Sequence, residues 1–175
     1  MSPKVLIVCL GNICRSPMGE AVLGHIAKER KIDLTVDSAG LVDDHVGEEP
    51  DQRSVYTPRG FATIDRPYPP PVLQYYHRMQ EGVHYFDFPK YDALDTILPQ
   101  YGISIDQEAR QVNQRDFYNF THILASDESN LNNLLRLKPG DSTAEVKLWG
   151  SYLDGQPIAD PYYGGAVSWH CARVP

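Results

Sequence analysis

The chain has 175 residues, of which 42% are hydrophobic, so it is long and apolar enough to fold as one domain around a sizeable core. Its net charge of −7 and the lack of a basic cluster argue against a nucleic-acid partner. No apolar run approaches the length of a membrane span, and the run at residues 5–8 is too short for the apolar region of a signal peptide.

The three cysteines point to a reducing compartment. Three is an odd count, and Cys9 and Cys14 lie five residues apart, with Arg15 directly after the second. This arrangement is typical of reactive thiol chemistry rather than of a disulfide framework. We therefore expect the protein to reside in the cytosol.

The predicted elements alternate between strands and helices. Residues 5–8 are short, apolar and β-branched, as in a buried strand, and Pro17 fits the first turn of a helix that ends near residue 30. The alternation predicts an α/β fold, a three-layer α/β/α sandwich around a four-stranded parallel sheet, with ligands beyond the carboxyl ends of the strands. Cys9, Ser38 and Asp127 all follow or end predicted strands, so we expect them to converge. The remaining predicted elements are a strand at 34–38 closed by Gly40, a strand at 121–126, a helix at 127–137 and a strand at 145–149.

Two segments depart from this pattern. Residues 55–88 show no clear periodicity and have a proline-rich centre at 66–72, and a compact domain rarely carries so long an irregular loop. Residues 166–175 are the last ten of the chain and do not fit a closing helix. We therefore predict a single domain over residues 1–175, with an irregular insert at 55–88 and an atypical, truncated end at 166–175.

The loop at residues 9–16 carries the predicted chemistry. It joins a buried strand to a helix, so its backbone N–H groups and the helix N-terminus would attract an anion. Gly11 permits a positive φ, and Asn12 tolerates the left-handed conformation. The same positive field should lower the pKa of Cys9, and Ser16 can donate a hydrogen bond to its thiolate. The alternative is a buried cysteine in an ordinary strand-to-helix turn. The predicted phosphate-binding residues are Leu10, Gly11, Asn12, Ile13, Cys14, Arg15 and Ser16, with Arg15 offering a planar fork to two phosphate oxygens.

Nucleophilic attack by Cys9 on a phosphate ester needs an acid that protonates the leaving oxygen, and Asp160 is the candidate. A tyrosyl oxygen, with a pKa of about 10, departs slowly unless it is protonated. Pro161 restricts Asp160 to an extended conformation and stiffens the loop. An isolated Asp-Pro pair is usually a turn, but together with the Cys9 loop it predicts a general acid.

Taken in chain order, these motifs resemble the low-molecular-weight protein tyrosine phosphatase family. The resemblance implies hydrolysis of phosphotyrosine and small aryl phosphates through a cysteinyl-phosphate intermediate. It also implies phosphotyrosine proteins as substrates, and neither a cofactor nor a metal. The segments that carry it are residues 5–21, 37–40, 109–112, 116–117, 127–131, 148–152 and 160–164.

The resemblance also implies roles for single residues. Cys9 resembles the nucleophile and Arg15 the phosphate clamp, while Asp160 resembles the acid that later activates water. Asn12 and Ser38 resemble the polar pair that holds the loop in its strained shape.

Further implied roles each have a simpler alternative. Asp127 resembles the carboxylate that positions the arginine, but it also fits a helix N-cap, and both roles are compatible. Cys14 resembles the second cysteine, which traps Cys9 in a reversible disulfide under oxidation, but it could simply pack under the loop. Tyr162 and Tyr163 resemble the aromatic wall of the substrate cleft, although exposed loop tyrosines are common.

The chain also departs from the family pattern. Gln107 and Tyr101 stand where the family usually has histidines, which alters the local hydrogen-bond support but not the chemistry. The family continues after residues 160–164 with a helix that packs on the sheet, and residues 166–175 offer no counterpart.

Two other functions remain open at this point. An arsenate reductase shares the fold and the loop but needs further cysteines for a disulfide relay, and Cys171 is the only one left. A noncatalytic or unstable splice product that binds phosphoproteins would explain the insert and the truncated end. Turnover of p-nitrophenyl phosphate separates these alternatives from a phosphatase.

Overall fold

The computed structural model describes residues 2–51, 105, 107–152, 155–158 and 160. The predicted insert at 55–88 and the predicted atypical end at 166–175 lie outside the described residues, as does the segment where a closing helix would fall.

Four parallel strands form one sheet, as the sequence predicts. The strand order is β2-β1-β3-β4, so β1 lies in the interior and pairs with both β2 and β3. The register places Val8 beside Ala39 of β2 and Ala125 of β3. The carboxyl ends of the strands therefore meet at one edge of the sheet. The strands are β1 (Lys4–Cys9), β2 (Thr35–Gly40), β3 (His122–Ala125) and β4 (Glu145–Leu148).

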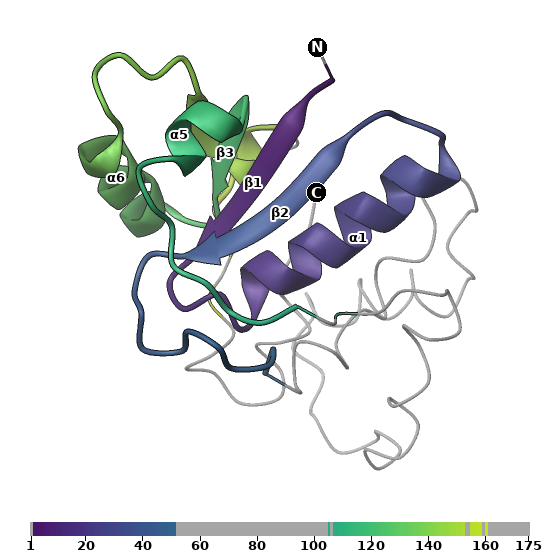
Figure 1. Cartoon of the computed structure of the whole chain (residues 1–175), viewed down its shortest axis with the longest axis horizontal. Coiled ribbons are helices and arrows are strands. Elements are labelled where there is room, and N and C mark those ends of the chain that lie inside the picture. Colours follow the sequence, from purple (N-terminus) through teal and green to yellow (C-terminus); the bar gives the residue numbers. More distant parts are fainter. Residues whose placement is uncertain (1, 52–104, 106, 153–154, 159, 161–175) are drawn as a thin grey trace, which may run out of the picture.

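Helices cover both faces of the sheet and complete the predicted three layers. Helix α1 (Arg15–Glu29) lies on one face, and α5 (Asp116–Asn119) and α6 (Glu128–Leu137) lie on the other (Figure 1). A short 3-10 helix, η2 (Trp149–Tyr152), follows β4 directly. In the described part of the chain, no helix combines the length and hydrophobicity that crossing a bilayer requires.

The alternation of side chains along β1 divides the core into two clusters. Leu6 is fully buried in a cluster with Leu134 of α6, whereas Ile7 is fully buried in a cluster with Met18 of α1. Successive strand side chains point to opposite faces of a sheet, so a single apolar strand supplies both cores. This double burial fixes β1, and it therefore fixes the position of Cys9 at the end of β1.

Three differences from the sequence prediction concern the helices. Helix α1 begins at Arg15, two residues before Pro17, so the arginine belongs to the first helical turn. Pro17 is still in that turn, where its missing N–H costs nothing. Trp149 leaves the strand and begins η2. Helix α5 was not predicted, because four residues are too few to show a helical period.

Gly19 lets α1 approach the sheet closely. A Cβ atom at Gly19 would meet Cζ3 of Trp149 at 2.6 Å and Cδ1 of Ile7 at 3.1 Å, and it would also meet Cη2 of Trp149. At Gly24, on the same helix, a Cβ atom would have no neighbour within 4 Å. The two glycines thus share a secondary structure but differ in packing.

We predict that Gly19→Ala lowers the melting temperature although alanine is the better helix former. Overpacking costs about 1–3 kcal/mol, which outweighs the helix-propensity gain of about 1 kcal/mol. Gly24→Ala is the matched control and should raise the melting temperature by about 2–4 °C. Thermal unfolding followed by circular dichroism measures both, and equal shifts in the same direction would contradict this packing argument.

Candidate active site

The loop after β1 adopts the predicted left-handed conformation at Asn12 but not at Gly11. Asn12 has φ of 58°, as its residue type allows. The expectation of a positive φ at Gly11 is wrong, because Gly11 is not among the glycines with positive φ. A Cβ atom at Gly11 would come within 2.8 Å of Cδ2 of His45, so a larger residue would require the His45 side chain to move. The segment after β2 therefore packs closely against Gly11.

Cys9 has the environment of a thiolate. Its side chain is 1% exposed, and its Sγ atom lies 3.0 Å from Oγ of Ser16. A hydrogen bond from the Cys14 thiol lowers the pKa of Cys9 to about 5 against the opposing effect of burial, with help from Ser16 and the charge of Arg15. The same hydrogen bond raises the pKa of Cys14, which keeps the shared proton. Of the two thiols, Cys9 is therefore the one that ionises more readily, and Cys14 keeps its proton.

Arg15 is buried at the start of α1 and forms ion pairs with two carboxylates. Its Nη1 atom donates to Oδ2 of Asp127 at 2.7 Å and to the carbonyl of Ile158 at 3.1 Å. Its Nη2 atom donates to Oδ2 of Asp160 at 2.8 Å. Its Nε atom is buried and has no hydrogen-bond partner among the described residues. Since an unsatisfied buried donor is costly, Nε marks a position suited to an anion's oxygen.

Asp127 performs two tasks with its two oxygens. Its Oδ1 atom accepts from the backbone N–H of Asn130 at 2.8 Å and caps α6, whereas Oδ2 accepts from Arg15. Burial alone would raise the pKa of Asp127, but the hydrogen bonds from Asn130 and Arg15 lower it. The carboxylate of Asp127 therefore stays ionised. Because it also caps the N-terminus of α6, it holds the Arg15 side chain in place relative to that helix.

The side chain of Asn12 ties the loop to β2. Its Nδ2 atom donates to Oγ of Ser16 at 2.9 Å and to Oγ of Ser38 at 2.8 Å. Its Oδ1 atom accepts from the backbone N–H of Arg110 at 2.8 Å. Asn12 is 1% exposed, so these bonds replace those to water that burial removed.

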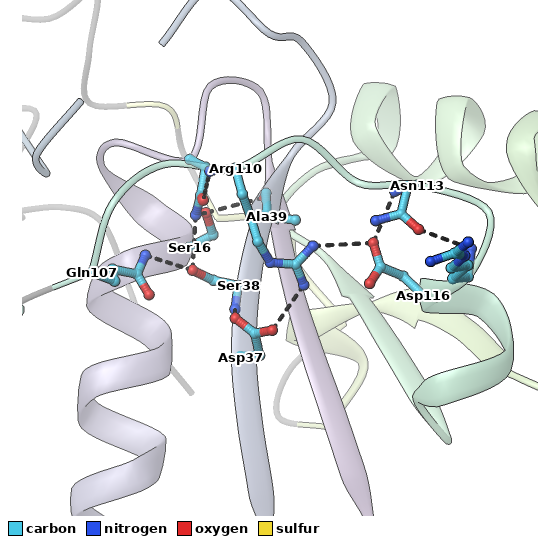
Figure 2. Close-up of polar contacts among 10 residues, drawn as sticks. Ser16, Asp37, Ser38, Ala39, Gln107, Arg110, Asn113 and Asp116 are labelled. Carbon is cyan, nitrogen blue, oxygen red and sulfur yellow. Dashed lines mark hydrogen bonds and ion pairs between the residues drawn. The ribbon is translucent and has the colours of Figure 1, made fainter. Parts of the chain in front are cut away.

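Gln107 supports this network although the family that the chain resembles usually has a histidine at this position. Its amide group lies 2.7 Å from Oγ of Ser38 (Figure 2). With the amide oxygen turned toward Ser38, the NH₂ group of Gln107 donates to the carboxylate of Glu20. The neutral amide of Gln107 thus forms the hydrogen bond with Ser38.

A small pocket of about 100 Å³ opens at the loop. Arg15 and Asp160 both line it, whereas Cys9 is buried at the end of β1. Asp44 and His45, from the segment after β2, also line the pocket. The other lining residues are Leu10, Gly11, Ile13, Cys14 and Val42.

The structure thus brings together the predicted residues that it describes. Tyr162 and Tyr163 lie outside the described residues. No local pattern in the sequence pointed to a role for His45 or Arg110. Arg110 lies in one of the resembling segments, 109–112, but its side-chain partners are far away in sequence.

We predict that alkylation of Cys9 by iodoacetamide shows a midpoint near pH 5. The thiolate is the reactive form, so the rate should rise through this midpoint and then level off, whereas an ordinary thiol would have its midpoint at about 8.5. Ser16→Ala removes one donor to the thiolate and should raise the midpoint. Peptide mass spectrometry resolves Cys9 from the other cysteines. A midpoint above pH 8 in the unmodified sequence would contradict the thiolate assignment.

Comparison with known proteins identifies the family. A sequence model described as low molecular weight phosphotyrosine protein phosphatase matches residues 4–62 and 89–173. A protein of that name from Schizosaccharomyces pombe is 34% identical over 169 residues, which cover 93% of this chain and 83% of that protein. Its counterpart from Sus scrofa is 32% identical in an alignment that covers 99% of this chain and 91% of that protein.

Solved structures agree with the sequence comparison. The structure described as DARP, drosophila arginine phosphatase, superposes with a TM-score of 0.67 at 30% identity, covering 97% of this chain and 87% of that one. The structure of Primo-1 superposes with a TM-score of 0.66 at 30% identity, covering 97% of this chain and 88% of that one. The chain therefore belongs to the low molecular weight phosphotyrosine protein phosphatase family.

Proposed function

We propose that this protein hydrolyses phosphotyrosine in proteins, and small aryl phosphates, through a cysteinyl-phosphate intermediate on Cys9. The observation that carries the proposal is the environment of Cys9, which favours a thiolate. The same loop also holds Arg15, whose buried Nε atom has no hydrogen-bond partner among the described residues. Reduced thiol chemistry of this kind supports a cytosolic location.

In the first step the Cys9 thiolate attacks phosphorus. The S–P bond forms as the bond to the aryl oxygen breaks, and Asp160 gives its proton to the departing oxygen. Phosphate oxygens accept from the backbone N–H groups of the loop and from Arg15. To do so they displace Asp160 from Nη2 of Arg15, where it lies at 2.8 Å.

In the second step water attacks phosphorus and Asp160 takes up its proton. The S–P bond breaks and inorganic phosphate leaves. The departing sulfur is again a thiolate, stabilised by Ser16 at 3.0 Å and by the Cys14 thiol. Cys14 also gives the site a protective reaction, since a sulfenic acid on Cys9 would condense with it to a disulfide that thiols reduce.

Other substrates and reactions are distinguishable by experiment. One relative is named an arginine phosphatase, so a phosphoarginine peptide belongs beside the phosphotyrosine peptide in any assay. Arsenate reduction would require a further cysteine relay, and Cys171, the remaining cysteine, lies outside the described residues. A binding protein without turnover would hold the phosphopeptide and release no phosphate.

We predict that Cys9→Ser abolishes turnover of p-nitrophenyl phosphate and of a phosphotyrosine peptide. The variant should still bind the peptide, because Arg15 and the backbone N–H groups of the loop remain. Phosphate release measures the first effect and calorimetric titration the second. Appreciable turnover by Cys9→Ser would show that another group attacks phosphorus.

We predict that Asp160→Ala slows hydrolysis of phenyl phosphate by about 10²–10⁴-fold, as the loss of a proton donor does. An aryl phosphate with a strongly acidic leaving group should be affected far less, since it departs without a proton. Asp43→Ala removes an exposed carboxylate outside the pocket and serves as the matched control. Equal losses for both leaving groups would rule out Asp160 as the acid.

A further inference from the structure

We propose that Arg110 is a positioning residue for this reaction, acting through Asn12 and Ser16 on the sulfur of Cys9. The role in turnover rests on the proposed function, whereas the effect on Cys9 itself is independent of it. Arg110 does not line the pocket, and none of its hydrogen bonds among the described residues goes to Cys9, so the effect would pass through a chain of hydrogen bonds.

Residues 109–112, here named the strap, continue the sheet beyond β2. The backbone N–H of Gly40 donates to the carbonyl of Arg110 at 2.8 Å, and the N–H of Val112 donates to the carbonyl of Gly40 at 2.8 Å. These two bonds form a parallel bridge between Gly40 and Gln111. The bridge brings the strap to the end of β2, beside the loop that follows β1.

The side chain of Arg110 fastens the strap to two other elements. Its Nη2 atom lies 2.8 Å from Oδ2 of Asp37 in β2, and its Nη1 atom lies 3.1 Å from Oδ2 of Asp116 in α5 (Figure 2). Asp116 is 7% exposed, and the same oxygen accepts from the backbone N–H of Asn113 at 2.8 Å. One guanidinium group therefore joins the strap, the sheet and α5, a task that suits its planar fork better than the point charge of a lysine.

The backbone N–H of Arg110 determines which way the Asn12 amide points. It donates to Oδ1 of Asn12 at 2.8 Å, so Nδ2 faces Ser16 and Ser38. The hydroxyl oxygen of Ser16 then accepts from Nδ2, and its single proton has two possible acceptors. These are the sulfur of Cys9 at 3.0 Å and the carbonyl of Ala39 at 3.4 Å. The nearer and charged acceptor is favoured, so Ser16 donates to Cys9.

This chain of hydrogen bonds gives Arg110 a consequence for chemistry. If the strap shifts, the buried oxygen of Asn12 loses its donor, and the amide is no longer held in one orientation. Ser16 would then share its proton among other acceptors. The thiolate of Cys9 would lose a stabilising donor, both before attack and when it departs from the cysteinyl phosphate.

We test this inference with Arg110→Met and its matched control, Arg115→Met. Arg115 is exposed and forms no ion pair among the described residues, so its loss removes the same charge from the same segment. We expect the midpoint of Cys9 alkylation to rise by about one pH unit in Arg110→Met, equivalent to a tenfold weaker preference for the thiolate, and to stay unchanged in the control. The kcat for an aryl phosphate should fall about tenfold with little change in KM. Arg110→Lys, which keeps the charge and loses the fork, should fall between.

A second variant, Asp37→Asn, distinguishes an effect of the position of the strap from an effect of charge on Cys9. It also provides a test if Arg110→Met does not fold. Removal of a negative charge would by itself favour the thiolate and lower the alkylation midpoint. Loosening the strap raises the midpoint instead, and this rise is the result we expect. A midpoint that falls or stays unchanged in Asp37→Asn overturns the inference, as does an equal shift in Arg115→Met. Alkylation needs no turnover, so an absence of phosphatase activity in the unmodified sequence would overturn only the proposed function.

Discussion

The site depends on the buried amide of Asn12 being held in one orientation. The residue sits in the left-handed region, with φ of 58°, and its side chain makes three hydrogen bonds of 2.8–2.9 Å. These bonds offset the strain of the loop and connect it to β2 and to the strap. Because β1 is packed on both faces, the loop starts from a rigid point, and Asn12 determines the path that it then takes.

The charges of the site explain why this rigidity matters. A thiolate on Cys9 and the carboxylates of Asp127 and Asp160 surround the single guanidinium of Arg15. Backbone N–H groups and the N-terminus of α1 supply the remaining positive potential. Asp160 occupies Nη2 of Arg15 at 2.8 Å, so a bound phosphate dianion would compete with this carboxylate for the guanidinium.

Local patterns in the sequence predict much of this arrangement. The apolar run at 5–8 and the loop at 9–16 indicate a strand, an anion-binding turn and a helix within one continuous segment. Contacts between distant segments leave no such pattern. A Cβ atom at Gly11 would meet the His45 side chain, and Arg110 is paired with Asp37, which lies 73 residues earlier in the chain. Such partners become apparent only when the strands are placed side by side.

The covalent intermediate on Cys9 is the most direct test of the mechanism. A radiolabelled aryl phosphate would be mixed with enzyme, and the reaction quenched in acid within a single turnover. Digestion and mass spectrometry would then locate the label. The mechanism predicts labelled phosphate on the peptide that carries Cys9, formed as fast as the phenol is released. Full phenol release with no labelled peptide, or a label on another residue, would contradict it.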